Sequence, residues 1–168
     1  MEFLPTVSKQ DLDNAREDNW DFIYAILEPY QDAIEEAEEE EDILDQLTDD
    51  QHVLLIYDAL YGQVTNGGFL QLIHNGYGQF IFETGFDEDL EKWGLKETAE
   101  IVRKAEAIFV EHKGLLEEER DLEAFSALYK TFTHFESLDN AFYDVMDEEV
   151  ATFRAYIEAH LDTFAKIV

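Results

Sequence analysis

The sequence has 168 residues, 46% of them hydrophobic and 14% aromatic, and its 41 acidic and 11 basic residues give a formal net charge of −30. This much apolar material excludes a disordered acidic tail, and the length suits one domain with a real core. The absence of cysteine excludes disulfides and thiolate metal sites. The charge argues against direct binding to nucleic acid, because phosphates would repel it.

Hydrophobic periodicity predicts helices in the N-terminal half. The first covers residues 20–27 and has its apolar side chains at Trp20, Ile23, Tyr24 and Leu27. Pro29 is expected to end that helix or to begin the next one. Thr48 and Gln51 form a candidate capping box for a helix that is broken at residues 65–68, after which a short apolar helix follows.

The C-terminal half predicts further helices. One covers residues 96–112, with Gly114 as its stop signal, another covers residues 122–132, and the last begins at about Glu148. No alternating pattern predicts a strand, and no linker divides the chain. We therefore predict an all-α fold, with residues 1–168 forming a single compact multi-helix domain.

The negative charge is concentrated in one part of the sequence. Residues 17–91 contain 21 of the 41 acidic residues and no Lys or Arg, whereas residues 92–168 contain 17 acidic and 9 basic residues. The densest part is residues 32–50, where apolar residues recur at roughly helical spacing. An acidic helix with a narrow apolar stripe is predicted there, with residues 38–42 left open as a loop between two helices. Its acidic members are Asp32, Glu35, Glu36, Glu38, Glu39, Glu40, Glu41, Asp42, Asp45, Asp49 and Asp50.

No targeting or membrane segment is predicted. Residues 1–10 lack a basic region followed by an apolar stretch, and the sequence contains no run of about 18 apolar residues. We expect a cytoplasmic protein that does not bind a membrane.

No group of residues selects a catalytic or metal site. The five histidines form no i, i+4 pair, and Asp49 with His52 has a spacing that is common by chance. Residues 11–13 and 87–89 begin like an EF-hand loop but do not continue to the required glycine. We therefore predict no catalytic residue, no metal and no cofactor.

The acidity has a structural and a functional interpretation. It could serve solubility or adaptation to high salt, although a halophilic protein would be acidic along its whole length. Alternatively, carboxylates at i and i+4 on a helix lie about 6 Å apart along the axis, close to the interval between neighbouring phosphates on one DNA strand. Lys and Arg of a DNA-binding protein would then pair with Asp and Glu as they pair with phosphates.

Residues 57–78, YDALYGQVTNGGFLQLIHNGYG, resemble the Asn-Gly-Gly-Phe-x-Gln signature of a bacterial family known through an acidic DNA-mimic protein. Leu72-Ile73 departs from the pattern, because aromatic residues are more usual there. The resemblance implies an all-helical, often dimeric protein without catalysis, and a characterised member that keeps a helix-turn-helix repressor off its operator. The matching residues, which we interpret as fold markers, are Tyr57, Asn66, Gly67, Gly68, Phe69, Gln71, Asn75 and Gly78.

These observations predict a DNA-mimic protein whose acidic surface, centred on residues 32–50, binds a basic DNA-binding protein such as a transcription factor and blocks its binding to DNA. A homodimer is expected from the resemblance. Two alternatives stay open. One is an acidic interaction or immunity-type module for another basic protein, and the other is a metal-dependent enzyme with a pocket near residues 66–71.

Overall fold

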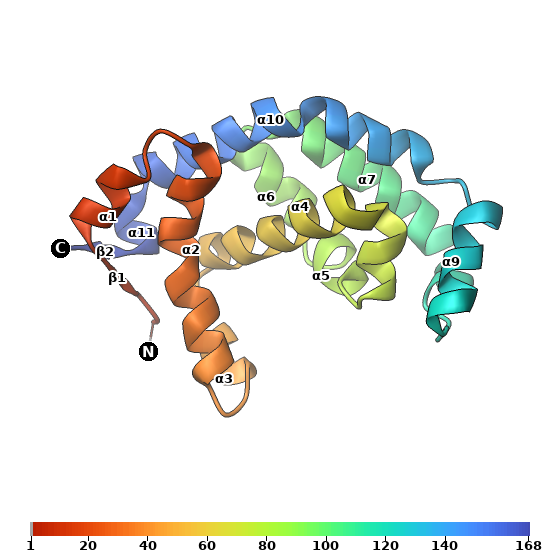
Figure 1. The fold of residues 1–168 in the computed structure, drawn as a ribbon, viewed down its shortest axis with the longest axis horizontal. Helices are drawn as coiled ribbons and strands as arrows, with labels where there is room; N and C mark the ends of the chain where they lie inside the picture. The colour runs from red at the N-terminus through yellow and green to blue at the C-terminus, as the bar shows by residue number, and fades with distance from the viewer. Residues whose placement is uncertain (1) are drawn as a thin grey trace. The chain divides into compact units, whose positions relative to one another are not determined.

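The computed structural model describes residues 2–168, which form an all-α protein with eleven helices and one two-stranded sheet (Figure 1). The contacts group these residues into two compact units. Unit 1 contains residues 2–55 and Val150–Val168, and unit 2 contains Ile56–Glu149. Over the described part of the chain, no helix is both long enough and apolar enough to cross a membrane.

Two long helices contribute residues to both units. Helix α4 spans Asp49–His74, and helix α10 spans Glu136–Ala159. The sequence places the start of the last long helix at about Glu148, which is wrong, because α10 begins already at Glu136. Its first half buries Leu138 and Phe142, and the Phe142 ring lies 5.9 Å from that of Tyr61, so that its helical structure depends on tertiary packing.

Helix α2 (Asn19–Glu36) is the main helix of unit 1. The Asp18 side chain caps it by accepting a hydrogen bond from the Asp21 N–H over 2.9 Å. Pro29 lies inside the helix, so the prediction that it marks an end is wrong. Buried side chains on both sides of the proline hold the two halves in one helix and offset the lost backbone hydrogen bond. They are Phe22, Ile23, Ile26, Leu27 and Tyr30.

The other elements of unit 1 are short. They are β1 (Thr6–Val7), α1 (Lys9–Asn14), α3 (Glu41–Leu44), α11 (Leu161–Phe164) and β2 (Lys166–Ile167). Strands β1 and β2 pair in parallel and bring the two ends of the chain together (Figure 1). The sequence pattern did not indicate this small sheet. Strands of two residues are too short to show an alternating pattern in the sequence.

Gln51 is buried and joins three segments of unit 1. Its Oε1 accepts from the Thr48 N–H over 2.8 Å, and Thr48 Oγ1 accepts from the Gln51 N–H over 3.3 Å, which confirms the capping box. The Gln51 Nε2 donates to the carbonyl oxygens of Phe3, at 2.9 Å, and Thr163, at 3.2 Å. The start of α4 is thereby tied to both the N-terminal segment and α11.

Unit 2 contains five further helices, α5 (Gly78–Phe82), α6 (Phe86–Lys92), α7 (Lys96–Glu111), α8 (Lys113–Leu116) and α9 (Leu122–Thr131). Helix α7 packs against α5 and α6. Two of these helices confirm predicted ones almost to the residue. Gly114 does not stop α7, however, because it lies within α8.

The first turn of α7 is capped by a residue far away in the sequence. The Thr98 N–H donates to Glu149 Oε1 over 2.7 Å, and both residues are buried. A helix begins with backbone N–H groups that have no partner within the helix, and a carboxylate there is favourable. Glu149 therefore anchors α7 to α10.

We predict that Gln51→Ala lowers the free energy of unfolding by about 2 kcal/mol or more, because two part-buried carbonyl groups lose their donor and α4 loses its cap. Urea denaturation followed by circular dichroism measures the change. Gln10→Ala, an exposed glutamine on α1, is the control, with an expected effect below about 0.5 kcal/mol. Equal effects of the two substitutions would contradict the joining role of Gln51.

Candidate functional site

The acidic segment, residues 32–50, is distributed over three helices. Helix α2 ends at Glu36, α3 begins at Glu41, and α4 begins at Asp49. The loop interpretation of residues 38–42 is thus confirmed for residues 38–40, and a single acidic helix is excluded. Consecutive carboxylates repel one another at i, i+3 and i+4 within a helix, whereas acidic residues in the first turn of a new helix are favourable.

Most carboxylates of the acidic segment face solvent. Ten of its eleven acidic residues are exposed, namely Asp32 and the nine from Glu35 to Asp49. The eleventh, Asp50, is half-buried and accepts a hydrogen bond from the Tyr156 hydroxyl over 3.0 Å. Within residues 2–168, none of the exposed ten forms an ion pair. The segment therefore presents a continuous set of negative charges that no cation of the described chain neutralises.

A narrow apolar stripe attaches the acidic segment to the rest of unit 1. No side chain from Gln31 to Asp50 is fully buried, but six apolar ones are half-buried: Ala33, Ile34, Ala37, Ile43, Leu44 and Leu47. The backbone adds a hydrogen bond from the Phe3 N–H to the Gln46 carbonyl over 3.2 Å. These contacts fix the segment while leaving its carboxylates exposed.

The exposed face of α2 extends the acidic segment toward its own N-terminus. Asp21, Glu28, Asp32 and Glu35 follow one another at intervals of seven, four and three residues, which places them on one side of the helix. The step from Glu28 to Asp32 is about 6 Å along the axis. Asp21 and Glu28 belong to the acidic interval 17–91 but not to residues 32–50, on which the sequence prediction was centred.

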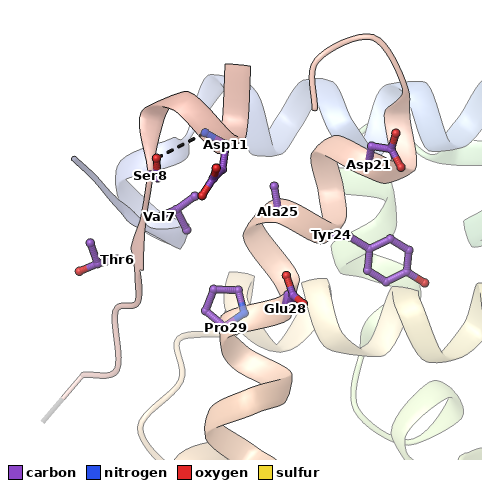
Figure 2. A pocket seen from close by; sticks show the side chains of 9 residues that line it. All are labelled: Thr6, Val7, Ser8, Asp11, Asp21, Tyr24, Ala25, Glu28 and Pro29. Carbon is purple, nitrogen blue, oxygen red and sulfur yellow. Dashed lines mark hydrogen bonds between the residues drawn. The ribbon is translucent and has the colours of Figure 1, made fainter. Parts of the chain in front are cut away.

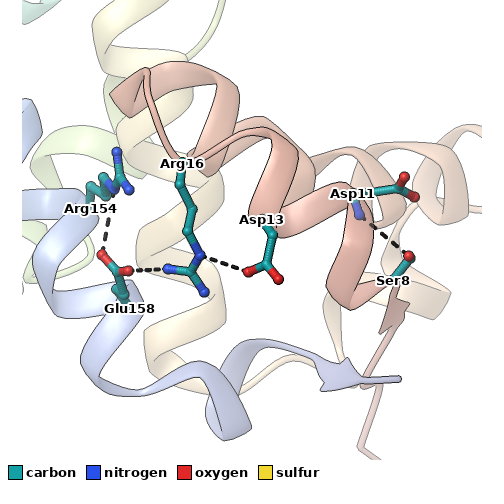
Figure 3. Close-up of polar contacts among 6 residues, drawn as sticks. All are labelled: Ser8, Asp11, Asp13, Arg16, Arg154 and Glu158. Atoms are coloured by element: carbon teal, nitrogen blue, oxygen red, sulfur yellow. Dashed lines mark hydrogen bonds and ion pairs between the residues drawn. The ribbon is translucent and has the colours of Figure 1, made fainter.

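Two of the four basic residues of unit 1, Arg16 and Arg154, form ion pairs with carboxylates outside the acidic segment (Figure 3). Arg16 pairs with Asp13 over 2.9 Å and with Glu158, and Arg154 pairs with Glu158 over 3.5 Å. The two guanidinium groups lie 5.5 and 4.5 Å from the ring centroid of Phe22, a distance that favours cation–π attraction. These cations stabilise the body of unit 1.

The two units differ less in charge than residues 17–91 and residues 92–168 do. Unit 1 contains 20 acidic and 4 basic residues, and unit 2 contains 21 and 7. In unit 2, however, carboxylates near the end of the interval 17–91 are paired. Arg103 bonds to Asp87 over 2.9 Å and also to Glu91, and Lys113 bonds to Glu83 over 2.7 Å. The unpaired acidic surface is therefore densest in unit 1.

The glycine pair of the signature bends α4 within unit 2. Gly67 and Gly68 have non-helical dihedral angles, and Gly68 has φ 74° and ψ −173°. After the bend, Asp139 Oδ1 accepts from the Phe69 N–H over 2.9 Å and so caps the second half of the helix. Tyr129 donates to the Gly67 carbonyl over 2.5 Å. The predicted break at residues 65–68 is confirmed, and α9 and α10 hold it in place.

The signature amides bond to one another. Asn66 Nδ2 donates to Gln71 Oε1 over 3.0 Å, Gln71 Nε2 donates to Gln63 Oε1 over 3.0 Å, and Asn75 Nδ2 donates to the same Gln63 oxygen over 2.8 Å. This network links the two halves of the bent helix. The sequence prediction did not include Gln63, although its Oε1 accepts hydrogen bonds from both Gln71 and Asn75.

The remaining signature residues lie in the core of unit 2. Tyr57 and Phe69 are fully buried, and the Phe69 ring lies 5.8 Å from that of Phe135. A Cβ at Gly78 would lie 3.2 Å from the Phe109 ring, so a glycine allows close packing there. These contacts are structural. Among residues 2–168, no group of three or more His, Asp or Glu side chains could hold a metal ion.

The fold and this surface define a class of protein: an all-α protein with a bent signature helix and an acidic face that its own cations leave unpaired. The DMP19-like protein family matches residues 45–160, and the chain belongs to this family. It is 32% identical over 146 residues, 86% of this chain and 87% of the relative, to a protein of Neisseria meningitidis serogroup B (strain ATCC BAA-335 / MC58) named DNA mimic protein DMP19.

We predict opposite effects for two glycine substitutions on α4. Gly68→Ala should destabilise the protein by about 1–3 kcal/mol, because its backbone angles are almost restricted to glycine and the new Cβ would lie 2.4 Å from Asp139 Oδ2. Gly62→Ala meets nothing within 4 Å and should stabilise by about 0.5–1 kcal/mol. Thermal and urea unfolding measure both. If Gly68→Ala left the free energy of unfolding unchanged, the bend would not be required for stability.

A second prediction concerns the pH dependence of stability. Burial raises the pKa of Asp139 to about 6, the nearby Glu136 adds to the increase, and the hydrogen bond from Phe69 opposes it. The pKa of Asp139 is therefore higher in the folded state than in the unfolded chain. Its contribution to the free energy of unfolding is complete when the pH is below the unfolded-state pKa, and it is lost as the pH rises through about 6. Asp139→Asn retains an acceptor for Phe69 and should remove this dependence.

Unfolding in urea at pH 4.5, 5.5 and 7 tests the effect, with Asp144→Asn, an exposed residue on the same helix, as the control. The stability of Asp139→Asn relative to the unmodified protein should rise with pH over this range, and that of the control should stay nearly constant. Parallel pH profiles for the unmodified protein and Asp139→Asn would refute the assignment.

Proposed function

We propose that this protein is a DNA mimic that binds a DNA-binding protein through the acidic segment and blocks its binding to DNA. A helix-turn-helix transcriptional repressor is the partner class that the family resemblance suggests. The relationship to a protein named DNA mimic protein DMP19 supports the general role. We also propose that the protein acts without catalysis, as a cytoplasmic homodimer.

The observation on which this proposal depends is the set of ten exposed carboxylates without an ion-pair partner among the described residues. A carboxylate that is already paired must give up its internal partner before it binds another cation. These ten have no internal ion pair to break, so they are free to pair with the cations of a partner. A DNA-binding surface has the complementary charge and the side chains that pair with an ordered row of oxyanions.

The arrangement of the segment supports a display of this kind. Within unit 1, the last turns of α2 and helix α3 extend away from the sheet and α1 (Figure 1). Along α2, carboxylates recur about every 4.5–10 Å, and further ones follow on the turn and on α3. Such an array has spacings in the range of phosphates on a DNA strand.

The mechanism of inhibition is competition for the same cations. A Lys or Arg that is paired with a carboxylate of the acidic segment cannot simultaneously neutralise a phosphate. Because the attraction acts at long range, association should be fast and should weaken steeply with salt. The partner would be released when DNA is in excess, since both ligands occupy one surface.

The immunity-type alternative depends on the same attraction and differs in the identity of the basic partner. Competition by duplex DNA distinguishes the two, because a toxin that does not bind DNA would not be displaced. The enzyme alternative has less support. The amides near residues 66–71 bond to one another and to Gln63.

We predict that Glu38→Gln, Glu39→Gln and Glu40→Gln together weaken partner binding about tenfold at 50 mM salt, corresponding to three exposed charge pairs of about 0.5 kcal/mol each. The control combines Glu117→Gln, Glu118→Gln and Glu119→Gln, which removes the same charge from three consecutive exposed glutamates of unit 2. Calorimetry against a panel of purified helix-turn-helix repressors from the same genome measures binding.

The unmodified protein should bind at least one repressor, operator duplex should displace it, and the control triple should bind nearly as well. Three outcomes would argue against mimicry by the acidic segment. They are an affinity that does not change with salt, a ternary complex of the protein, the repressor and the operator duplex, and an equal loss of affinity in the two triple variants.

A further inference from the structure

Unit 1 contains an open groove of about 380 Å³ between its N-terminal segment and α2 (Figure 2). One wall comes from β1 and α1, and the other comes from the exposed side of α2. Its lining residues are Thr6, Val7, Ser8, Asp11, Asp21, Tyr24, Ala25, Glu28 and Pro29. The groove is therefore built by two segments of the same unit, and none of the residues assigned to the acidic segment lines it.

The α2 wall is one continuous helical face. Asp21, Tyr24, Ala25, Glu28 and Pro29 occupy positions i, i+3, i+4, i+7 and i+8, which lie on the same side of a helix. This side is distinct from the buried side that packs in the core of unit 1. Glu28 is followed by Asp32 one turn later, so the groove leads directly into the acidic segment.

The groove combines negative charge with apolar surface. Asp11, Asp21 and Glu28 are exposed, no Lys or Arg is among the lining residues, and none of the three carboxylates forms an ion pair with a described residue. The exposed ring of Tyr24 and the half-buried Pro29 add apolar contact surface. Lys and Arg side chains pack their aliphatic stems on apolar surface and direct their charge toward carboxylates.

One edge of β1 is open toward additional pairing. Its hydrogen bonds to the C-terminal strand involve the Pro5 carbonyl, at 2.8 Å from Lys166 N, and the Val7 carbonyl, at 3.1 Å from Val168 N. Backbone groups alternate in direction along a strand, so the N–H and C=O of Thr6 point to the opposite edge. Thr6 lines the groove. Such an edge can accept an extended peptide as an additional strand.

We propose that this groove binds an extended basic segment of a partner protein, which pairs with the open edge of β1 and places Lys or Arg side chains against Asp11, Asp21 and Glu28. Flexible basic arms are common in DNA-binding proteins, where they extend along the DNA beyond the main binding element. The identity of the partner as a DNA-binding protein rests on the proposed function. The preference for an extended basic chain rests on the groove itself.

The test uses a synthetic peptide, acetyl-Arg-Thr-Arg-Thr-Arg-Thr-amide, titrated into the full chain by calorimetry at 50 mM salt. The groove variant combines Asp11→Asn, Asp21→Asn and Glu28→Gln. The control is the triple at Glu117, Glu118 and Glu119, which has the same change in charge. We expect the groove variant to bind the peptide at least tenfold more weakly and the control less than twofold more weakly.

A second peptide separates strand pairing from charge alone. N-methylation of alternate residues keeps the three arginines but removes the N–H groups that would pair with β1, and we expect at least a tenfold loss of affinity. Equal binding of the two peptides, or equal binding of the first peptide by the groove variant and the control, would overturn the proposal. Circular dichroism verifies folding, and Glu28→Gln alone replaces a groove variant that fails to fold.

The outcome is independent of the repressor experiment. A peptide that binds in the groove when no repressor binds would support the groove and reject the proposed repressor partner. A repressor that binds through the acidic segment, with a peptide that does not distinguish the groove variant, would reject the groove alone.

Discussion

Mutual repulsion among carboxylates is the constraint on which this structure depends. A net charge of −30 opposes compaction, and few cations are available to counter it. The protein pairs several of them with its own carboxylates, as with Arg16 and Arg154 beside Phe22, which both pair with Glu158, and with Arg103, which pairs with Asp87 and Glu91. Repulsion in the acidic segment is left in place, and buried apolar residues of α2 hold that segment against it. A cationic partner would relieve this repulsion.

Scaffold and proposed binding surface occupy different parts of the chain. The signature residues are in unit 2, where they bend α4, bond to one another and fill the core, whereas the acidic segment is in unit 1. The match to the DMP19-like protein family begins at residue 45, so most of the acidic segment precedes it. Membership of the family therefore describes the scaffold, and the proposed function of this chain depends on carboxylates that the signature does not specify.

Helix α2 connects the two proposed binding features of unit 1. Its buried side anchors the unit, its exposed side forms a wall of the groove, and its last turn begins the acidic segment. A partner with a folded basic surface and an extended basic arm would find both kinds of site along one helix. This arrangement has a physical advantage, because a rigid helix keeps the distance between the two sites constant and so reduces the entropy lost on binding.

The sequence alone determined the all-α class, the Thr48–Gln51 capping box, the break at Gly67-Gly68 and the lack of cations near residues 32–50. These follow from local periodicity, backbone preference and composition, which act over a few residues. Only the tertiary structure decided that α2 continues through Pro29, that Asp139 caps the bent helix, and that β1 pairs with β2. Each depends on contacts between residues far apart in the sequence. The groove beside Glu28 belongs to the same group, since its opposite walls meet only when the N-terminal segment folds against α2.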